Sequence, residues 1–229
     1  MAPGNAPFSR AEYTRRIAKT RAAMQQAGIE LLFVTDPSNQ AWLTGYDGWS
    51  FYVHQGVLLG LEGEPVWWGR YMDSIGAGRT CWMGAEQIHG YGDHYVQSTE
   101  CHPMQDLAGH IRDLGFETGR IGVEMENYYY SAKAHAVLSE ELPQAQLLDA
   151  TALVNWQRLI KSEDEVGFIR KAARITEKVM ATAIERAAPG LRKNDLVADI
   201  FHAGITGVDD IWGDSPAIVP LTPSGLDAT

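Results

Sequence analysis

Two stretches of the sequence concentrate side chains that could do chemistry. The first, HGYGDHYVQSTECHP, places five possible metal donors within fourteen residues: His89, Asp93, His94, Cys101 and His102. Transition-metal sites usually pair such donors at tight spacings like C-x₂-C or H-E-x-x-H. None of these spacings is present, so we interpret this stretch as a polar loop with incidental histidines and assign it no metal.

The second stretch, TGYDGWSFYVHQG at residues 44–56, is rich in rings with polar tips. Its glycines favour turns, and its candidate binding residues are Trp49, Phe51, Tyr52 and His54. Such a loop can enclose a small cationic or zwitterionic ligand through cation–π contacts and hydrogen bonds. The same rings could instead pack at a domain or subunit interface. Both interpretations remain open at this point.

A covalent nucleophile has no local support in the sequence. Ser224 in TPSG is the nearest approach to the G-x-S-x-G turn of serine hydrolases and does not match it. No recognised signature surrounds Cys81 or Cys101. The glycine-rich phosphate loops G-x-G-x-x-G and G-x-x-x-x-G-K-[ST] do not occur either. We therefore assign no catalytic residue and no nucleotide cofactor to the chain.

Composition narrows the possible partners. The formal net charge of −10 argues against a nucleic-acid surface, which needs a basic stripe. No apolar run approaches the roughly 18 residues that span a bilayer, and the start MAPGNAPFSR does not resemble a signal peptide. Two cysteines are too few for a disulfide framework and fit a reducing compartment. We expect a cytoplasmic protein without membrane or nucleic-acid partners.

The elements that would position the aromatic loop alternate between helices and short apolar strands. A capping box at Ser9–Glu12 begins a helix that Gly28 ends. A buried strand is expected at 29–35, ended by a turn at 36–39. Further elements are two strands within 56–69, a helix at about 103–114, a strand at 120–126, a helix at about 130–141 and a strand at 145–151. This alternation predicts an α/β domain over residues 1–154.

The pattern becomes helical after Asn155. A second capping box, Ser162–Glu165, begins a long amphipathic helix that Pro189 and Gly190 end, and Asn194 is expected to cap the next helix. The apolar run 217–221 reads as a strand, and residues 223–225 read as a turn. We place a second domain at residues 155–229.

One stretch of this second domain resembles a known family. The residues NWQRLIKSEDEVGFIRKAARITEKVM, with the element Arg158-x-x-Lys-Ser-x-x-Glu165, are similar to the entry of the catalytic domain in the creatinase, prolidase and aminopeptidase P group. The resemblance implies a creatinase-like N-terminal α/β domain. It also implies that residues 155–229 are the first helices and first strand of a pita-bread (α+β) domain, which would be incomplete in this chain.

Within the group, four stretches are similar to the ectoine hydrolases: VTDPSNQAWLTGYDGWSFYVHQGVLLGLEGEPVWWGR, GDHYVQSTECHPM, GVEMENYYYSA and GDSPAIVPLTPSG. This resemblance implies hydrolysis of the cyclic amidine of ectoine, a zwitterionic compatible solute. It also implies a homodimer in which the N-terminal domain reaches the partner's active site, where Trp49, Phe51, Tyr52 and His54 would contact the solute.

The resemblance places the catalytic centre of the group in the C-terminal domain. None of the group's five metal-ligand positions matches a residue here, and His202 lies on a predicted amphipathic helix, where we interpret it as a structural or surface residue. We therefore expect the catalytic residues to lie beyond Thr229 and this chain to be inactive alone. Metal dependence stays open. The alternatives are a non-catalytic dimerisation or solute-binding module, and a fragment of a metal-dependent Xaa-Pro peptidase.

Overall fold

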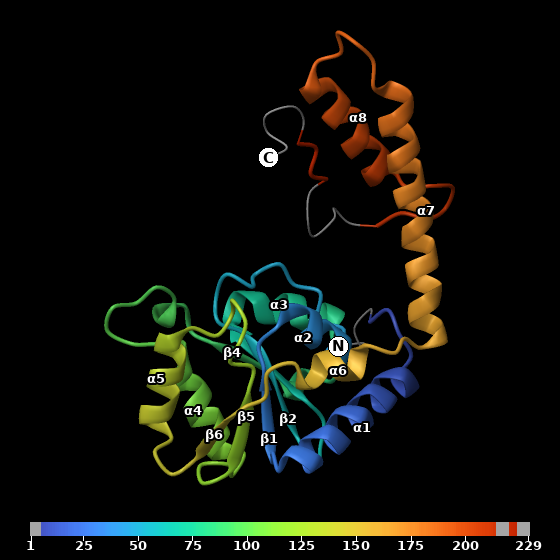
Figure 1. Cartoon of the computed structure of the whole chain (residues 1–229). Coiled ribbons are helices and arrows are strands. Elements are labelled where there is room, and N and C mark those ends of the chain that lie inside the picture. The colour runs from blue at the N-terminus through green and yellow to red at the C-terminus, as the bar shows by residue number, and fades with distance from the viewer. Residues whose placement is uncertain (1–5, 214–219, 224–229) are drawn as a thin grey trace. The chain divides into compact units, whose positions relative to one another are not determined.

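The structure is a computed structural model that describes residues 6–213 and 220–223. Within them the chain divides into two compact units, residues 1–160 and 161–229. The first unit contains every named strand (Figure 1). Its elements in chain order are α1 Arg10–Ala27, β1 Leu31–Val34, α2 Pro37–Thr44, β2 Gly56–Gly60, β3 Val66–Arg70, α3 Tyr71–Thr80, β4 Ile88–Tyr91, α4 Pro103–Asp113, β5 Arg120–Val123, α5 Ala132–Glu141, β6 Gln146–Asp149 and α6 Leu153–Arg158.

The six strands form one mixed sheet in the order β4-β3-β2-β1-β5-β6. Strand β1 is parallel to β5, which is parallel to β6, and β3 is parallel to β4. Strand β2 runs antiparallel to both of its neighbours, β1 and β3. The carboxyl ends of β1, β5 and β6 therefore meet at one edge of the sheet.

Helices cover both faces of this sheet (Figure 1). Alternation along β1 divides the core, because successive side chains of a strand point to opposite faces. Leu32 and Val34 pack with apolar residues of α1, α2, α3 and α6. Leu31 and Phe33 pack with those of α4 and α5. The first unit is thus a three-layer α/β sandwich, and its mixed α/β class is the predicted one.

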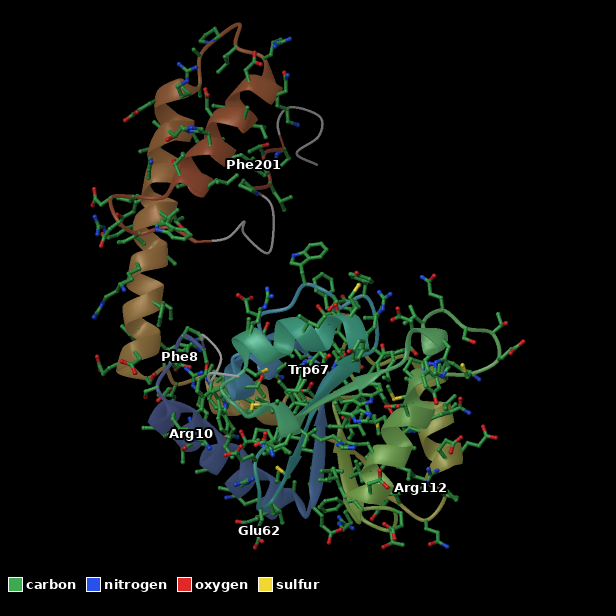
Figure 2. All side chains as sticks on the ribbon, turned by 180° about the vertical axis from the view of Figure 1, so that it is seen from behind. Phe8, Arg10, Glu62, Trp67, Arg112 and Phe201 are labelled. Atoms are coloured by element: carbon green, nitrogen blue, oxygen red, sulfur yellow. The ribbon has the colours of Figure 1, made fainter. Side chains whose placement is uncertain are left out.

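Strand β3 shows how completely the sheet is enclosed. Trp67 and Trp68 follow each other in the strand, belong to opposite faces, and are both 0% exposed. In Figure 2, Trp67 lies inside the first unit, whereas Arg112 lies on the outer side of α4. Each tryptophan buries a large apolar surface, so the two faces are both hydrophobic cores rather than one core and one wet face.

Local signals explain several helix ends. Ser9 accepts a hydrogen bond from the Glu12 amide at the start of α1, and Gly28 ends it at φ +66°. The second capping box also forms as predicted, with Ser162 and Glu165 bonding reciprocally at the start of α7, Glu163–Arg186. Helix α8, Lys193–Thr206, packs against α7 in the second unit. The expected cap at Asn194 is wrong by two positions, because the N-cap residue is Arg192.

Two other expectations of secondary structure are wrong, and one helix was not predicted. Residues 36–39 are not a turn: Asp36 caps α2, and Pro37 occupies its first position, where a missing amide costs nothing. Helix α3 was not expected because Gly76 and Gly78 weaken the helical pattern. The expected polar loop from residue 89 begins as strand β4, which pairs with β3 at the edge of the sheet.

Two expectations concern the carboxyl-terminal part of the chain. Most of the strand predicted at 217–221 and of the turn at 223–225 lies outside the described residues, and Pro220 and Leu221 are in neither a helix nor a strand. Helix α6 packs against α1 and α2, so the first unit extends to residue 160. That the second unit is the start of a pita-bread domain stays a proposal.

Candidate functional site

The aromatic loop connects α2 to β2 and is anchored from inside by Tyr46. The Tyr46 hydroxyl lies 3.2 Å from Ser50 Oγ and donates to Gln55 Oε1 at 3.1 Å. Its ring packs on Trp67 with centroids 4.9 Å apart. The loop returns so closely over Tyr46 that a Cβ at Gly48 would collide with the Tyr46 hydroxyl. Tyr46 is therefore part of the support, and the loop beyond it presents the other rings.

The four predicted binding residues occupy different environments. Trp49 and Tyr52 are 74% and 68% exposed. Phe51 packs between rings, with centroids 5.0 Å from Trp49 and 6.0 Å from Tyr129. His54 is half-buried at the base of the loop. The loop thus offers two exposed ring faces, supports them with Phe51, and turns His54 inward.

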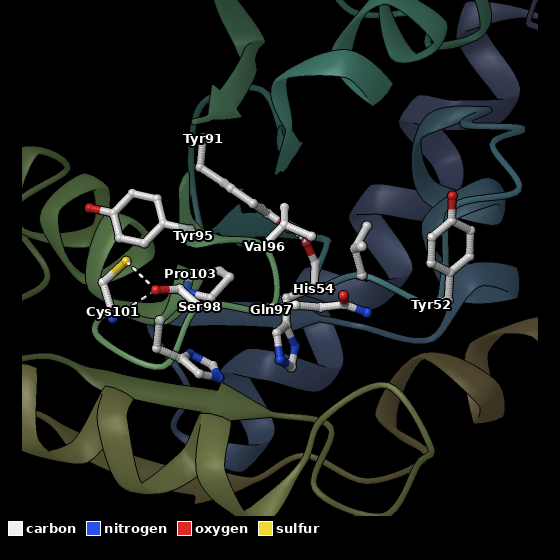
Figure 3. A pocket seen from close by; sticks show the side chains of 11 residues that line it. Tyr52, His54, Tyr91, Tyr95, Val96, Gln97, Ser98, Cys101 and Pro103 are labelled. Carbon is white, nitrogen blue, oxygen red and sulfur yellow. Dashed lines mark hydrogen bonds between the residues drawn. The ribbon is translucent and has the colours of Figure 1, made fainter. Parts of the chain in front are cut away.

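His54 and Tyr52 line a cavity of about 190 Å³ (Figure 3). This volume is below the roughly 300–1,000 Å³ of most ligand pockets, so it suits a small solute or one part of a larger site. Most of its other walls come from β4 and the segment after it. The full lining is Tyr52, Val53, His54, Tyr91, Tyr95, Val96, Gln97, Ser98, Cys101, His102 and Pro103.

Two histidines face each other in this cavity. The rings of His54 and His102 lie 4.8 Å apart and are tilted by 47°. Burial lowers the pKa of His54, against a hydrogen bond with the Tyr129 carbonyl. Burial, the neighbouring His54 and the charge of Lys133 lower the pKa of His102 to about 4. Both imidazoles are therefore neutral near pH 7, and they offer hydrogen-bonding atoms without positive charge.

A second hollow, of about 310 Å³, lies on the other side of Tyr52. It is lined by Tyr46, Gly48, Trp49, Ser50, Tyr52, Met72, Asp73 and Gly76. Asp73 gives this hollow a carboxylate, whereas none of the residues lining the His54–His102 cavity is acidic. Tyr52 belongs to both walls, and Phe51 lines neither. Two of the predicted residues, Trp49 and Tyr52, therefore meet in this hollow, and Tyr52 and His54 meet in the other.

Another pair of histidines is tied to a carboxylate. His89 on β4 and His110 on α4 stack with centroids 4.5 Å apart. Asp106 Oδ1 lies 3.0 Å from His89 Nε2 and accepts a hydrogen bond of 2.7 Å from the indole of Trp68. Burial, and then His89, lower the pKa of His110. This pair lines none of the cavities described above and links α4 to the sheet.

A buried carboxylate lies where parallel strands β1 and β5 end. Glu124 accepts hydrogen bonds from the amides of Thr35 and Asp36 at 2.7 and 2.8 Å. It also accepts one from the side chain of Asn39 at 2.6 Å. Asn39 in turn accepts from Arg158 on α6 at 2.6 Å. Burial raises the pKa of Glu124 to about 7 and the Asp36 carboxylate adds to the rise, while the three hydrogen bonds oppose it.

The arrangement can bind a small polar molecule. In the part of the chain that the structure describes, no three His, Cys, Asp or Glu side chains converge to hold a metal ion, and no helix is long and apolar enough to cross a bilayer. His102, Ser98 and Gln97 were not predicted as lining residues. They follow β4, which lies two strands from β2 in the sheet, and the aromatic loop leads into β2. This proximity depends on the strand order, which local spacing in the sequence does not contain.

The fold is thus an α/β sandwich domain with a small cavity beside an aromatic loop. Residues 16–160 match the Creatinase/Prolidase N-terminal domain, so the chain belongs to the creatinase/prolidase family.

Individual relatives agree with this assignment. The chain is 53% identical over 228 residues to the ectoine hydrolase of Halomonas elongata. That alignment covers 97% of this chain and 57% of the other protein. It is 42% identical to an uncharacterized hydrolase/peptidase of Sinorhizobium fredii, over 93% of this chain and 54% of the other. The fold is similar to an Xaa-Pro dipeptidase from Bacillus anthracis, with a TM-score of 0.67 at 16% identity over 85% of this chain and 50% of that one.

The chain therefore spans about half the length of the curated relatives it matches. The first of these relatives is a hydrolase by name, and the second is named an uncharacterized hydrolase/peptidase.

Proposed function

We propose that this chain is the N-terminal portion of an ectoine hydrolase and supplies part of its solute-binding surface. The observation that carries the proposal is the 53% identity to the Halomonas elongata ectoine hydrolase, which extends over the aromatic loop and the cavity beside it. A cationic amidine ring suits the exposed faces of Trp49 and Tyr52, because aromatic faces attract cations. His54 would contribute a neutral hydrogen-bonding group at the same place.

The reaction of the whole enzyme would add water at the amidine carbon and break one C–N bond of the ring. The product is an N-acetyl-2,4-diaminobutyrate: the water oxygen becomes the acetyl carbonyl oxygen, and the leaving nitrogen takes both water hydrogens to become an ammonium group. A general base or a carboxylate nucleophile would activate the attack. We match no residue of this chain to that role, so the proposal assigns it to residues outside this chain and leaves metal dependence open.

The proposed setting is a cytoplasmic homodimer in which the first unit of one subunit reaches the active site of the other. Exposed rings at Trp49 and Tyr52 suit such a role, since aromatic side chains with polar tips are enriched at interfaces. A non-catalytic solute-binding or dimerisation module is the main alternative. A fragment of an Xaa-Pro peptidase is a weaker one, because the likeness to the dipeptidase supports only the fold.

Two measurements on the purified 229-residue chain test the proposal. Calorimetric titration should detect ectoine binding, which Tyr52→Ala weakens by about tenfold through loss of the ring face, and should detect no binding of an Xaa-Pro dipeptide. Incubation with ectoine should yield no product. Preference for the dipeptide would overturn the proposal in favour of a peptidase, and turnover by the chain alone would overturn the assignment of catalysis to other residues.

A further inference from the structure

The segment from residue 94 to 103 forms most of one wall of the His54–His102 cavity (Figure 3). We propose that His102 on this wall is the hydrogen-bond donor of a subsite for the carboxylate group of a small solute. The inference rests on the proposed function for the identity of that solute, but the subsite itself is argued from its own atoms.

The orientation and tautomer of His102 are fixed by its backbone neighbours. Its Nδ1 accepts a hydrogen bond from the Met104 amide at 3.2 Å, and its own amide donates to Gln105 Oε1 at 2.9 Å. In the neutral ring the proton must therefore be on Nε2. This N–H is a donor on a residue that lines the cavity, and a carboxylate oxygen is a suitable acceptor for it.

Ser98 supports the same wall. Its Oγ accepts from the amides of Glu100 and Cys101, both at 3.2 Å, and these two bonds occupy the two lone pairs of a hydroxyl oxygen. Cys101 Sγ lies 3.3 Å from Ser98 Oγ and 3.4 Å from the His94 carbonyl oxygen. Because a thiol has one hydrogen, which the His94 carbonyl can accept, the Ser98 hydroxyl hydrogen is directed at Cys101 Sγ. Ser98 therefore shapes the wall around His102 and supplies no donor to a solute.

Backbone strain lies in the same wall. Gln97 adopts φ +53°, the left-handed region that non-glycine residues rarely occupy. Gln97 lines the same cavity as His54 and Ser98 (Figure 3). Such strain costs about 1–3 kcal/mol and persists where the surrounding structure requires it, as at ligand-binding positions.

No carboxylate is among the groups that act on His102. Burial, His54 from the aromatic loop and Lys133 from α5 lower the pKa of His102, and Cys101, Tyr91 and Tyr95 line the same cavity. Carboxylates act on the far part of this wall: after burial, Asp73, Asp106 and Asp93 raise the pKa of Tyr91, and Asp106 and Glu141 raise that of Tyr95. A carboxylate bound against His102 raises the pKa of that ring, because a neighbouring negative charge favours the protonated imidazole.

A pH-dependent titration of the 229-residue chain tests the subsite. The ring signals of His102 are followed by NMR while sodium acetate, ectoine, or 2-methyl-1,4,5,6-tetrahydropyrimidine, which is ectoine without its carboxylate, is added. We expect acetate and ectoine to raise the pKa of His102, and both to bind more tightly as the pH falls from 7 to 5, because the protonated ring binds the anion better. The amidine without a carboxylate should leave the His102 pKa unchanged.

Variants separate recognition from folding. His102→Asn keeps a good helix cap for α4 and removes the Nε2 donor. It should weaken ectoine binding by about tenfold, as for loss of a hydrogen bond to a charged group. His89→Asn, which changes the other histidine pair, is the matched control and should leave binding unchanged.

The outcomes distinguish the two proposals. If ectoine quenches Trp49 fluorescence while His102→Asn binds it like the wild type, the subsite is overturned and the proposed function survives. If acetate raises the His102 pKa while ectoine does not bind, the subsite stands and the proposed function fails. If neither molecule perturbs His102 and ectoine does not bind, both are overturned.

Discussion

The two histidine pairs of the first unit have similar ring contacts and different surroundings. His89 and His110 stack beside Asp106, which also holds the indole of Trp68, so that pair joins a helix to a sheet. His54 and His102 face a cavity that contains no acid among its lining residues. Asp106 is the hydrogen-bond partner of His89 in the first pair, whereas His110 Nε2 is buried without a hydrogen-bond partner among the described residues. In the second pair, we propose that a carboxylate from a solute bonds His102. Ring proximity alone therefore does not identify a site, and the two pairs differ in whether a carboxylate of the chain contacts one of the rings.

The largest expected contrast is in thiol reactivity, which reports whether the His54–His102 cavity is open. Cys101 lines that cavity, whereas Cys81 is 0% exposed and burial raises its pKa to about 12. Because the thiolate is the reactive form, Cys101 should react with iodoacetamide at least about a hundredfold faster than Cys81. Mass spectrometry of peptides sampled over time measures both rates, and Cys101→Ser is the control. Equal rates in the native protein would show that the cavity is closed.

The next prediction tests whether the His89–His110 pair, with Asp106, stabilises the fold. Asp106→Ala removes the acceptor of Trp68, whose indole is buried, and the partner of His89. Leaving such a donor unsatisfied should lower the free energy of unfolding by about 2–3 kcal/mol. Asp106→Asn, which can still accept from the indole, should cost less. Denaturation with urea at pH 7.5 measures the free energy of unfolding of both variants. An Asp106→Ala variant as stable as the wild type would remove the distinction between the two histidine pairs.

Glu124, whose hydrogen-bonded cluster contains no histidine, should make the free energy of unfolding depend on pH, and its raised pKa fixes the sign of that dependence. Its folded pKa of about 7 lies above the unfolded value of 4.5, so the folded state holds more protons between these values. Stability from this group is therefore lost as the pH rises from about 4.5 to 7, by at most about 1.4 kcal/mol per pH unit. Glu124→Gln should abolish this contribution. A stability profile measured by urea unfolding at several pH values checks it, and an unchanged slope would contradict the prediction.

The smallest predicted effect is the contribution of His102 to the pH dependence of stability, which is opposite in sign to that of Glu124. Its folded pKa of about 4 lies below the ordinary 6.5, so the unfolded state holds more protons between these values. Stability from His102 is present above about pH 6.5 and lost as the pH falls toward 4, by well under about 1.4 kcal/mol per pH unit because the ring is only half-buried. His102→Asn should flatten the acid side of the same profile. Steeper acid destabilisation in that variant would refute the low pKa.

The sequence predicts those elements whose ends carry their own chemistry. Ser9 and Gly28 bound α1, and Ser162 with Glu165 begins α7, because capping depends on residues only a few positions apart. The same local logic misreads Asp36 and Pro37, since an Asp-Pro pair serves a turn and a helix start equally well. Only the packing of α2 against α1 and α6 decides between them.

Only part of the candidate site could be predicted from the sequence, for a related reason. The aromatic loop is dense enough in rings to be recognised by composition, and two of its residues line the cavity, Tyr52 and His54. His102 is a single histidine without metal-ligand spacing, and its neighbour His54 is distant in the chain. The assignment of Trp49, Phe51, Tyr52 and His54 to solute contact stays a prediction.

The helix α6 has a consequence for how this protein is made. The Lys19 ammonium donates to the Gln157 carbonyl at 2.7 Å, and Asn39 Oδ1 accepts a hydrogen bond from the Arg158 guanidinium. The first two helices are therefore hydrogen-bonded to the last few residues of the same unit. A nascent chain emerges from the ribosome N-terminus first, at about 5–20 residues per second. The earliest helices must therefore wait for α6 to be translated before their polar groups find these contacts. Native assembly of the first unit is thus timed by its final segment.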